Sequence, residues 1–382
     1  MHAWLLPEYI EDVLPPEAWK IEQIRRRLLD LFHSNGYEFV IPPLLEYLPS
    51  LLTGTGSDMD LKTFKLVDQL TGQMMGLRAD ITPQAARIDA HLLNRPGVVR
   101  LSYTGSVVHS LPNGVTQNRE PLQIGAELFG HSGIESDGEI QRLMLKSLQS
   151  LGIEHIQLDL GHVGIIGSLM NAAGLRNEQE TELFGALQSK DAAGIKALTR
   201  DCPSEVCQAL RALPELYGGV EILEKARGVL PNLGGIGAAL DQLATLGKLA
   251  EGLVSDVCYD LAELRGYHYH SGVVFSAYSR ERSHAVALGG RYDEVGKVFG
   301  RSRPATGFSM DLRVLAALAK LEPGKGAILA PAAVDAKLEE KIEFLRTAGE
   351  VVVVQLPGSS MEEGGFRRRL EQRNGEWQVI DL

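Results

Sequence analysis

The chain has 382 residues, of which 44% are hydrophobic and 23% charged, and its formal net charge is −11. A domain usually takes about 100–200 residues, so the length excludes a single small core and predicts two or three domains. Proteins that bind nucleic acids usually present a basic face to the phosphates, so the acidic balance favours other partners, although it does not exclude a local basic patch.

Three further observations narrow the class of protein. No run of 18 or more uncharged apolar residues is present, and the acidic N-terminal segment lacks the pattern of a targeting peptide. The three cysteines, Cys202, Cys207 and Cys258, are too few for a disulfide framework, and no second Cys/His pair accompanies the first two. We therefore expect a cytoplasmic globular protein with no membrane span and no metal site.

The first 160 residues predict one helix followed by an antiparallel sheet. Apolar residues recur at helical spacing from residue 17 to 34, and Asn35-Gly36 is a stop signal. A second helix is expected at 82–93, with Thr82 as N-cap and Pro83 in its first turn, and a third at 138–151. Segments that predict strands, joined mainly as hairpins, are 37–41, 63–68, 74–80, 98–110, 120–130 and 155–163.

The second half predicts a helical insertion, a return of the sheet and a separate tail. Leucine and alanine dominate from about 165 to 250, where strand-like alternation disappears. Strands are then expected at 254–261, 269–278 and 284–293, and a strand that runs into a helix at 305–321. After a Pro-Gly linker, the tail predicts strand, helix, strand, a short helix at 366–374 and a last strand. We expect a core of residues 1–320 that contains the insertion, and a small α/β unit of residues 327–382.

Three short segments carry side chains suited to binding a small polar ligand. They contain Arg78, Asp80 and Thr82; Gln123, Gly125 and Glu127; and Arg265, Tyr267, His268, Tyr269 and His270. Strand alternation places Gln123 and Glu127 on one face, with a gap above Gly125 into which a ligand could sink. Acids, a glutamine and aromatic rings suit an amino group and a polar side chain. Taken singly, each segment fits a structural role better: the first a salt-bridged strand end, the second an exposed sheet face with a bulge glycine, and the third an amphipathic strand.

As a set, these segments resemble the catalytic core of class II aminoacyl-tRNA synthetases, and specifically histidyl-tRNA synthetase, over about residues 5–320. The segments that carry the resemblance are the opening LPPEAWKIEQIRRRLLDLF with GYEFVIPPLLEY, LRADIT, YTGSVVHS with EPLQIGAELFG, LRGYHYHSGVVF, LGGRYDEV and PATGFSMDL. The resemblance implies an α+β fold with an antiparallel sheet flanked by helices. Its first motif forms the dimer interface in that family, which implies a homodimer.

Two departures from the family concern the cations that hold ATP. The second motif has His109 where the family has an arginine and Leu111 where it has a glutamate, and the third motif has Val314 at its arginine position. Arg313 is one residue away, a rotation of about 100° on a helix, and Asp311 adds a negative charge. Losing one such cation typically costs about 2.7–4 kcal/mol in the transition state. The tail is also shorter than the anticodon-binding domain of such synthetases. The resemblance therefore implies that the chain activates no amino acid and has no catalytic residue.

The amino-acid pocket of the family is kept more fully. The resemblance implies that histidine is bound by Asp80, Thr82, Gln123, Glu127, Arg265 and Tyr269, whereas His268 and His270 replace family residues. Asp80 stands for a family glutamate. A pocket that fits histidine without activating it suits a sensor.

These features also resemble the synthetase paralogues that serve as regulatory subunits of ATP phosphoribosyltransferase. That resemblance implies a homodimer within a hetero-oligomer with the short-form catalytic subunit. The subunit would be required for the first step of histidine biosynthesis and for feedback inhibition by histidine, without a cofactor. An active histidyl-tRNA synthetase and a class II amino-acid ligase for another acceptor remain the alternatives.

Overall fold

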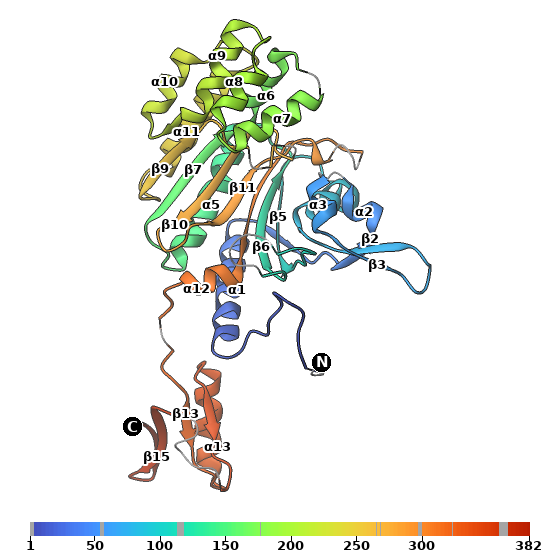
Figure 1. The fold of residues 1–382 in the computed structure, drawn as a ribbon. Coiled ribbons are helices and arrows are strands. Elements are labelled where there is room, and N and C mark those ends of the chain that lie inside the picture. Colours follow the sequence, from blue (N-terminus) through green and yellow to red (C-terminus); the bar gives the residue numbers. More distant parts are fainter. Residues whose placement is uncertain are drawn as a thin grey trace. The chain divides into compact units, whose positions relative to one another are not determined.

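The computed structural model describes residues 4–53, 57–112, 118–175, 177–264, 266–267, 269–296, 300–322, 324–358 and 366–382. The chain divides into two compact units, Met1–Lys320 and Leu321–Leu382, which can be followed by colour in Figure 1. None of the described helices is both long and apolar enough to span a membrane.

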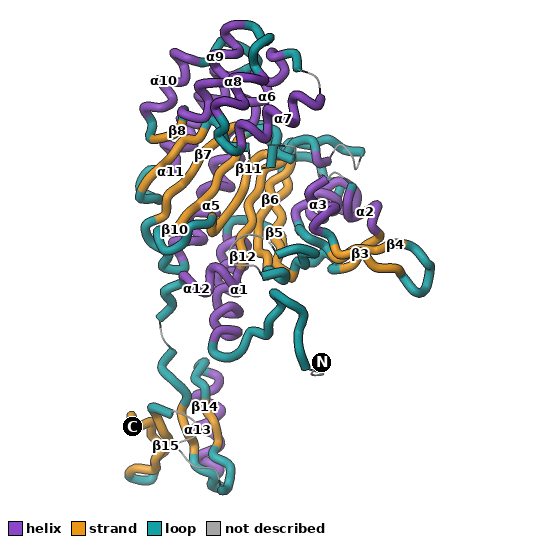
Figure 2. Tube along the Cα trace, in the orientation of Figure 1, coloured by secondary structure: helices purple, strands orange, loops and turns teal. Residues whose placement is uncertain are grey.

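A nine-stranded sheet forms the centre of the larger unit (Figure 2). In sheet order its strands are β1 (Glu38–Val40), β5 (Val99–Ser106), β6 (Leu122–Phe129), β12 (Ala305–Asp311), β11 (Ala285–Arg291), β10 (Val273–Ser279), β7 (Ile156–His162), β9 (Asp256–Asp260) and β8 (Tyr217–Gly218). The expected antiparallel pairing holds except at β1–β5 and β7–β9, which are parallel. Parallel neighbours need a long crossover, and both pairs are joined by more than fifty residues that contain helices.

Helices pack against the sheet and bury its apolar side chains. The main ones are α1 (Glu17–Ser34), α5 (Ile134–Ser150) and α12 (Leu312–Leu318). Helix α1 buries Ile21, Ile24, Leu28 and Phe32 at helical spacing. Phe32 packs edge-on against Phe308 of β12, with ring centroids 5.8 Å apart. The apolar stripe predicted from the sequence is therefore the face that meets the sheet.

A small three-stranded sheet is formed by residues that lie between β1 and β5 in the sequence. It has the order β2-β4-β3, and its elements are β2 (Leu45–Tyr47), α2 (Leu48–Leu52), α3 (Ser57–Lys62), β3 (Phe64–Val67) and β4 (Met74–Leu77). Helix α4 (Thr82–Arg87) follows and continues as a π-helical turn, η1 (Ile88–Leu93). The prediction that Thr82 caps this helix is wrong. Ile81 is the N-cap residue and makes no side-chain cap, while Thr82 lies in the first turn with Pro83.

The insertion between β7 and β9 is helical, apart from one short strand. Its elements are α6 (Val163–Ala173), α7 (Asn177–Gln188), α8 (Ala192–Leu198), α9 (Ser204–Ala212), η2 (Leu213–Glu215), β8, α10 (Glu221–Val229) and α11 (Ile236–Ala250). Strand β8 pairs with β9 and so attaches the insertion to the end of the main sheet. The sequence gives no sign of this strand because only two residues form it.

The smaller unit is a four-stranded sheet with one helix. Its elements are β13 (Ile328–Ala330), α13 (Ala336–Thr347), β14 (Val352–Val354), β15 (Arg368–Arg373) and β16 (Glu376–Asp381), with sheet order β14-β13-β15-β16. The short helix predicted at 366–374 is wrong, because β15 occupies most of that segment. Asn374 and Gly375 have φ values of 53° and 80°, which suits the two-residue turn of a β-hairpin. The turn brings Leu370 opposite Val379, and Leu370 is thereby buried.

Candidate amino-acid-binding site

Glu127 lies at the centre of the candidate site and is only 1% exposed. Tyr103 of β5 donates a hydrogen bond to one carboxylate oxygen over 2.8 Å, and Tyr292, just after β11, donates one to the other. Gly307 of β12 is paired with Glu127 on the neighbouring strand β6, and a Cβ atom at position 307 would collide with this carboxylate. Glycine at position 307 therefore makes room for the buried acid.

Burial raises the pKa of Glu127 to about 8. The hydrogen bonds from Tyr292 and Tyr103 oppose this rise, and the nearby charge of Asp80 adds to it. A carboxyl group with such a pKa is mostly protonated at pH 7 while the site is empty. A cationic or N–H-donating ligand would favour the ionised form, because opposite charge and hydrogen bonds stabilise a carboxylate.

Three side chains at the start of α4 and of β6 form a connected group beside Glu127. The Asp80 carboxylate accepts hydrogen bonds from the Thr82 main-chain N–H (3.0 Å) and from the Gln123 amide (2.8 Å). The Gln123 oxygen accepts one from the main-chain N–H of Ile81 (2.9 Å). The Thr82 hydroxyl lies 3.0 Å from that of Tyr103. The structure thus brings Asp80, Thr82, Gln123 and Glu127 together, although they come from two distant segments.

The expected gap above Gly125 is filled. Tyr103 is paired with Gly125 across the two strands, and a Cβ atom at Gly125 would lie 2.5 Å from the Tyr103 hydroxyl. The idea that a ligand sinks into this space is wrong, because a tyrosine occupies it and bridges Thr82 to Glu127. Sequence reasoning missed Tyr103. A signal was available, since large aromatic residues often cover a glycine on the neighbouring strand.

An aromatic wall borders the same carboxylate. The Tyr269 ring stacks on Tyr292 with centroids 5.2 Å apart, and His270 meets Tyr269 edge-on at 5.3 Å. Among the described residues the buried Tyr269 hydroxyl finds no hydrogen-bond partner. A buried polar group left in this state costs about 1–3 kcal/mol, so this hydroxyl favours a polar ligand beside it.

Two residues of the third predicted segment, Arg265 and His268, lie outside the described residues. His270 is described, and its Nδ1 lies 3.3 Å from the carbonyl oxygen of Arg291. Burial lowers the pKa of His270 to about 4, so its ring is neutral at pH 7. His270 thus adds no charge to the candidate site.

Arg78, from the first predicted segment, makes its hydrogen bonds with the main chain and Gln84, and among the described residues none of them goes to Asp80, Thr82 or Gln123. Its guanidinium is buried and donates to the carbonyl oxygens of Pro42 (2.7 Å) and Ser106 (2.9 Å). It also occupies the space above Gly105, where a Cβ atom would collide with it. Arg78 therefore joins the connecting chain to β5 and has a structural role.

Among the described residues, the positions that the sequence analysis compared with the family's phosphate-binding arginines, His109 and Val314, carry no free positive charge. His109 Nε2 lies 3.0 Å from the carbonyl oxygen of Ala79, and burial lowers the pKa of His109. Asp311 caps α12 by accepting from the Arg313 N–H (3.0 Å) and also accepts from the Leu122 N–H (3.2 Å). Arg313 is only 13% exposed, and its guanidinium lies 3.8 Å from Glu11.

The described residues contain no group of three or more His, Cys, Asp or Glu side chains placed to hold a metal. The buried Cys207 thiol donates to the carbonyl oxygen of Thr199, and all three cysteines are free.

Residues 9–315 match the family described as histidyl-tRNA synthetase, and residues 325–380 match the C-terminal domain of the ATP phosphoribosyltransferase subunit HisZ. The ATP phosphoribosyltransferase regulatory subunit of Nitrosospira multiformis is 55% identical over 100% of this chain and 99% of its own length. That of Ralstonia nicotianae is 56% identical over 99% and 98%. The chain belongs to the family of ATP phosphoribosyltransferase regulatory subunits. This confirms the resemblance inferred from the sequence and favours it over an active synthetase or ligase.

Comparison with solved structures confirms the fold of this regulatory subunit. A protein of Bacillus halodurans described as an ATP phosphoribosyltransferase regulatory subunit/histidyl-tRNA synthetase superposes with a TM-score of 0.81 at 28% identity, covering 95% of this chain and 96% of that one. A histidyl-tRNA synthetase of Nostoc superposes with a TM-score of 0.77 at 17% identity, covering 99% and 97%. The second likeness concerns the fold alone. The expected class II synthetase-like α+β fold is confirmed.

Proposed function

We propose that this chain binds histidine around Glu127 and sets the activity of an ATP phosphoribosyltransferase accordingly. Family membership makes the chain a non-catalytic subunit, so the phosphoribosyl transfer takes place on a partner, the short-form catalytic subunit. In this role the chain is required for the first step of histidine biosynthesis and carries its feedback inhibition by histidine. The observation that carries the proposal is a buried, tyrosine-held carboxylate beside positions where the cations for ATP are missing.

The side chains around Glu127 are complementary to histidine. The carboxylate of Glu127 accepts an imidazole N–H, and Asp80, with Thr82 and Gln123 beside it, accepts the α-ammonium group. The Tyr269 hydroxyl, which has no partner among the described residues, bonds the ligand. Arg265 takes the α-carboxylate. These contacts need a preformed pocket with a few convergent polar groups, which is the usual form of a small-molecule site.

In this proposal the chain does not activate the bound histidine, because the positive charges that adenylate formation needs are missing. Adenylate formation places developing negative charge on a phosphate and needs cations aimed at it. His109 lies against the main chain in a neutral form, Val314 carries no charge, and Asp311 is engaged at the start of α12. No nucleic-acid partner is proposed, and the chain acts in the cytoplasm.

Calorimetry on the purified full-length chain tests the proposal. Histidine is expected to bind, whereas ATP at the same concentration gives no heat above dilution. The catalytic subunit, assayed with and without this chain, is expected to lose activity when the chain is omitted and to lose its histidine inhibition as well. Robust ATP–pyrophosphate exchange with histidine would contradict the regulatory function and restore the synthetase or ligase alternatives.

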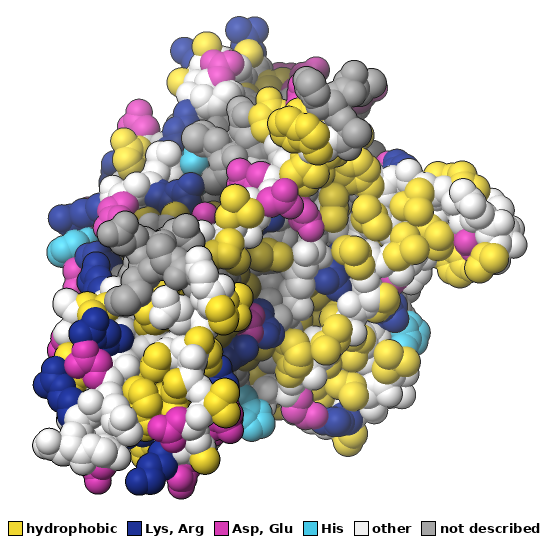
Figure 3. Space-filling view, turned by 90° about the horizontal axis from the view of Figure 1, so that it is seen from below, with side chains coloured by type: hydrophobic (Ala, Val, Ile, Leu, Met, Phe, Trp, Pro, Cys, Tyr) yellow, Lys and Arg dark blue, Asp and Glu magenta, His cyan; other side chains and the backbone are white. Residues whose placement is uncertain are grey.

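The chain is proposed to act as a homodimer within the hetero-oligomer. Support comes from exposed apolar side chains on and after the edge strand β1, the segment that resembles the first class II motif. They are Phe39, Ile41, Leu44, Leu45 and Tyr47. Apolar side chains also gather over the hairpin β3–β4 that projects at the right of Figure 3. Sedimentation of the isolated chain is expected to give a dimer, and Ile41→Asp is expected to give a monomer.

A further inference from the structure

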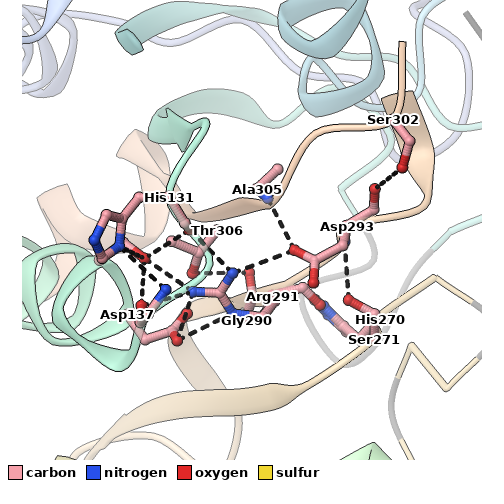
Figure 4. A network of polar contacts seen from close by, with 12 residues as sticks. His131, Asp137, His270, Ser271, Gly290, Arg291, Asp293, Ser302, Ala305 and Thr306 are labelled. Carbon is pink, nitrogen blue, oxygen red and sulfur yellow. Dashed lines mark hydrogen bonds and ion pairs between the residues drawn. The ribbon is translucent and has the colours of Figure 1, made fainter. Parts of the chain in front are cut away.

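Arg291 is almost completely surrounded by hydrogen-bond acceptors (Figure 4). Its guanidinium donates to the Asp137 carboxylate over 2.8 and 3.1 Å and to the Ser136 hydroxyl over 2.9 Å. It also reaches the carbonyl oxygens of His131 (3.2 Å) and Gly133 (3.1 Å) and the Asp293 carboxylate (3.2 Å). The arginine belongs to the GGRYDEV motif, none of whose residues the sequence assigned to the site.

This cluster fixes the main chain on both sides of Tyr292. Arg291 precedes it and is anchored to the start of α5. Asp293 follows it and accepts from the Ala305 N–H (2.9 Å), while its own N–H donates to the Ser271 hydroxyl (2.8 Å). The Tyr292 N–H donates to the Ala305 carbonyl oxygen (2.8 Å). With its backbone held in this way, Tyr292 directs its hydroxyl at Glu127.

The same cluster also holds the segment that carries Tyr269. The carbonyl oxygen of Arg291 accepts from the Ser271 N–H (2.8 Å) and lies 3.3 Å from the His270 ring. Tyr269 in turn stacks on Tyr292. Tyr269 and Tyr292 are therefore both held through one arginine, whose hydrogen bonds among the described residues go to residues other than Glu127.

Stability alone is a weak reason for such an arrangement. A buried ion pair often contributes little net stability, because desolvation offsets the attraction. The chain contains a second pair of the same kind, which serves as a reference. Arg303 and Asp89 are 2.8 Å apart with side chains 9% and 2% exposed, against 2.8 Å, 9% and 3% for Arg291 and Asp137. Arg303 bonds the turn at Arg95 and Gly97 instead of the residues beside Tyr292.

We propose that Arg291 is a positioning residue for the pocket: through Asp137 and Asp293 it holds Tyr292 against Glu127 and couples the occupied pocket to the start of α5. This inference rests on the histidine-binding function proposed above. Because binding free energies are linked reciprocally, a ligand that needs Tyr292 in place also stabilises the cluster that places it. Histidine binding is thus expected to tighten residues 131–137.

A double-mutant cycle on the full-length chain tests this. Calorimetry measures histidine affinity for the wild type, Arg291→Lys, Tyr292→Phe and the double variant. Arg291→Lys is expected to weaken binding about tenfold, as losing a charge-assisted hydrogen bond does. In the Tyr292→Phe background the same change is expected to have less than about a twofold effect, because no hydroxyl is left to position. Arg303→Lys, the matched control, is expected to lower Tm similarly and to leave affinity unchanged.

A second readout is amide hydrogen exchange of residues 131–137. Histidine is expected to slow exchange there in the wild type and in Arg303→Lys, but not in Arg291→Lys. If Arg291→Lys does not fold, the less buried Asp293→Asn takes its place, with the same expected loss of affinity and of protection.

The outcomes separate the two proposals. Absence of histidine binding to the wild type overturns the proposed function and this inference with it. Histidine binding that is equally strong in the wild type and Arg291→Lys, or additive effects in the cycle, overturns the positioning role alone. A loss of affinity in Arg303→Lys as large as in Arg291→Lys likewise assigns Arg291 a purely structural role.

Discussion

Two regions of the larger unit differ in chemistry: one surrounds Glu127 of β6, and the other contains His109, which follows β5, and Asp311 at the end of β12. Around Glu127, side chains bond one another, and the Tyr269 hydroxyl still lacks a partner among the described residues. Around His109 and Asp311, the side chains bond the main chain of the protein itself. The first region keeps side chains that can exchange a partner for a ligand. In the second region, His109 and Asp311 serve the fold. This difference supports the proposal that the chain binds an amino acid without activating it.

The largest expected effect comes from removing the carboxyl group of Glu127, which is expected to ionise when histidine binds. Glu127→Gln is expected to weaken histidine binding about 100-fold, because truncating one partner of a buried charged hydrogen bond costs about 2–5 kcal/mol. Calorimetry measures the change, and assembly with the catalytic subunit is expected to persist while feedback inhibition is lost. Unchanged histidine affinity would mean that the pocket lies elsewhere.

The next largest effect is a pH dependence of the unfolding free energy, which follows from the raised pKa of Glu127, about 8. The folded state keeps the proton that the unfolded state has released above its ordinary pKa. The unfolding free energy should therefore fall as pH rises towards 8, by up to about 1.4 kcal/mol per pH unit. The buried His270, with its pKa lowered to about 4, gives the opposite slope, but only between pH 4 and about 6.5.

Burial also lowers the pKa values of His109 and His162, whose contributions have the same sign as that of His270. The contribution of Glu127 is therefore read as the difference between the wild type and Glu127→Gln in denaturation between pH 6.5 and 8. Glu127→Gln is expected to remove the slope in this window. The wild type is also expected to release a proton when histidine binds at pH 7, which calorimetry in buffers of different ionisation enthalpy detects. Equal slopes in the two proteins would show that Glu127 is already ionised in the empty site.

Tyr103→Phe removes the hydroxyl that bridges Thr82 and Glu127, and a smaller effect is expected. Histidine affinity should fall about tenfold, since a hydrogen bond to a charged group is worth about 1.5–3 kcal/mol. Tyr37 offers a matched control, because it is also buried and donates to a glutamate, Glu139, over 2.9 Å. Tyr37→Phe should lower Tm and leave affinity unchanged. Equal effects on binding would remove the distinction between the pocket and the rest of the core.

The smallest effect is expected in the second region. Asp311→Ala removes the cap of α12 and should lower the unfolding free energy by about 1 kcal/mol, without changing histidine affinity. Asp311→Asn keeps an oxygen that can accept the Arg313 N–H and should restore most of the stability. Chemical denaturation measures both. If Asp311→Ala instead created ATP binding, this acid would be an active barrier to the nucleotide as well as a cap.

Local sequence patterns predicted most of the fold. They failed at segments whose conformation depends on residues that are close in space but are not read from the local pattern. Helix α1 and the strands of the main sheet other than β8 follow from the sequence patterns, and the face shared by Gln123 and Glu127 follows from strand alternation. The segment at 366–374 looked helical from its charged residues and leucine, yet the Asn374-Gly375 turn pairs it with β16 as a strand. Thr82 has the residue type of a helix cap, but its hydroxyl bonds Tyr103 instead.

The sequence by itself determined the fold class, the family and the candidate acids of the pocket, because these depend on residue type and spacing along the chain. Only the tertiary structure decided how the candidate site is held together. Tyr292 is 165 residues from Glu127 in the sequence, and Arg291 bonds Asp137 across 154. Hydrogen bonds over such separations depend on the register of packed strands and on which groups are buried together, and no local pattern encodes either of them.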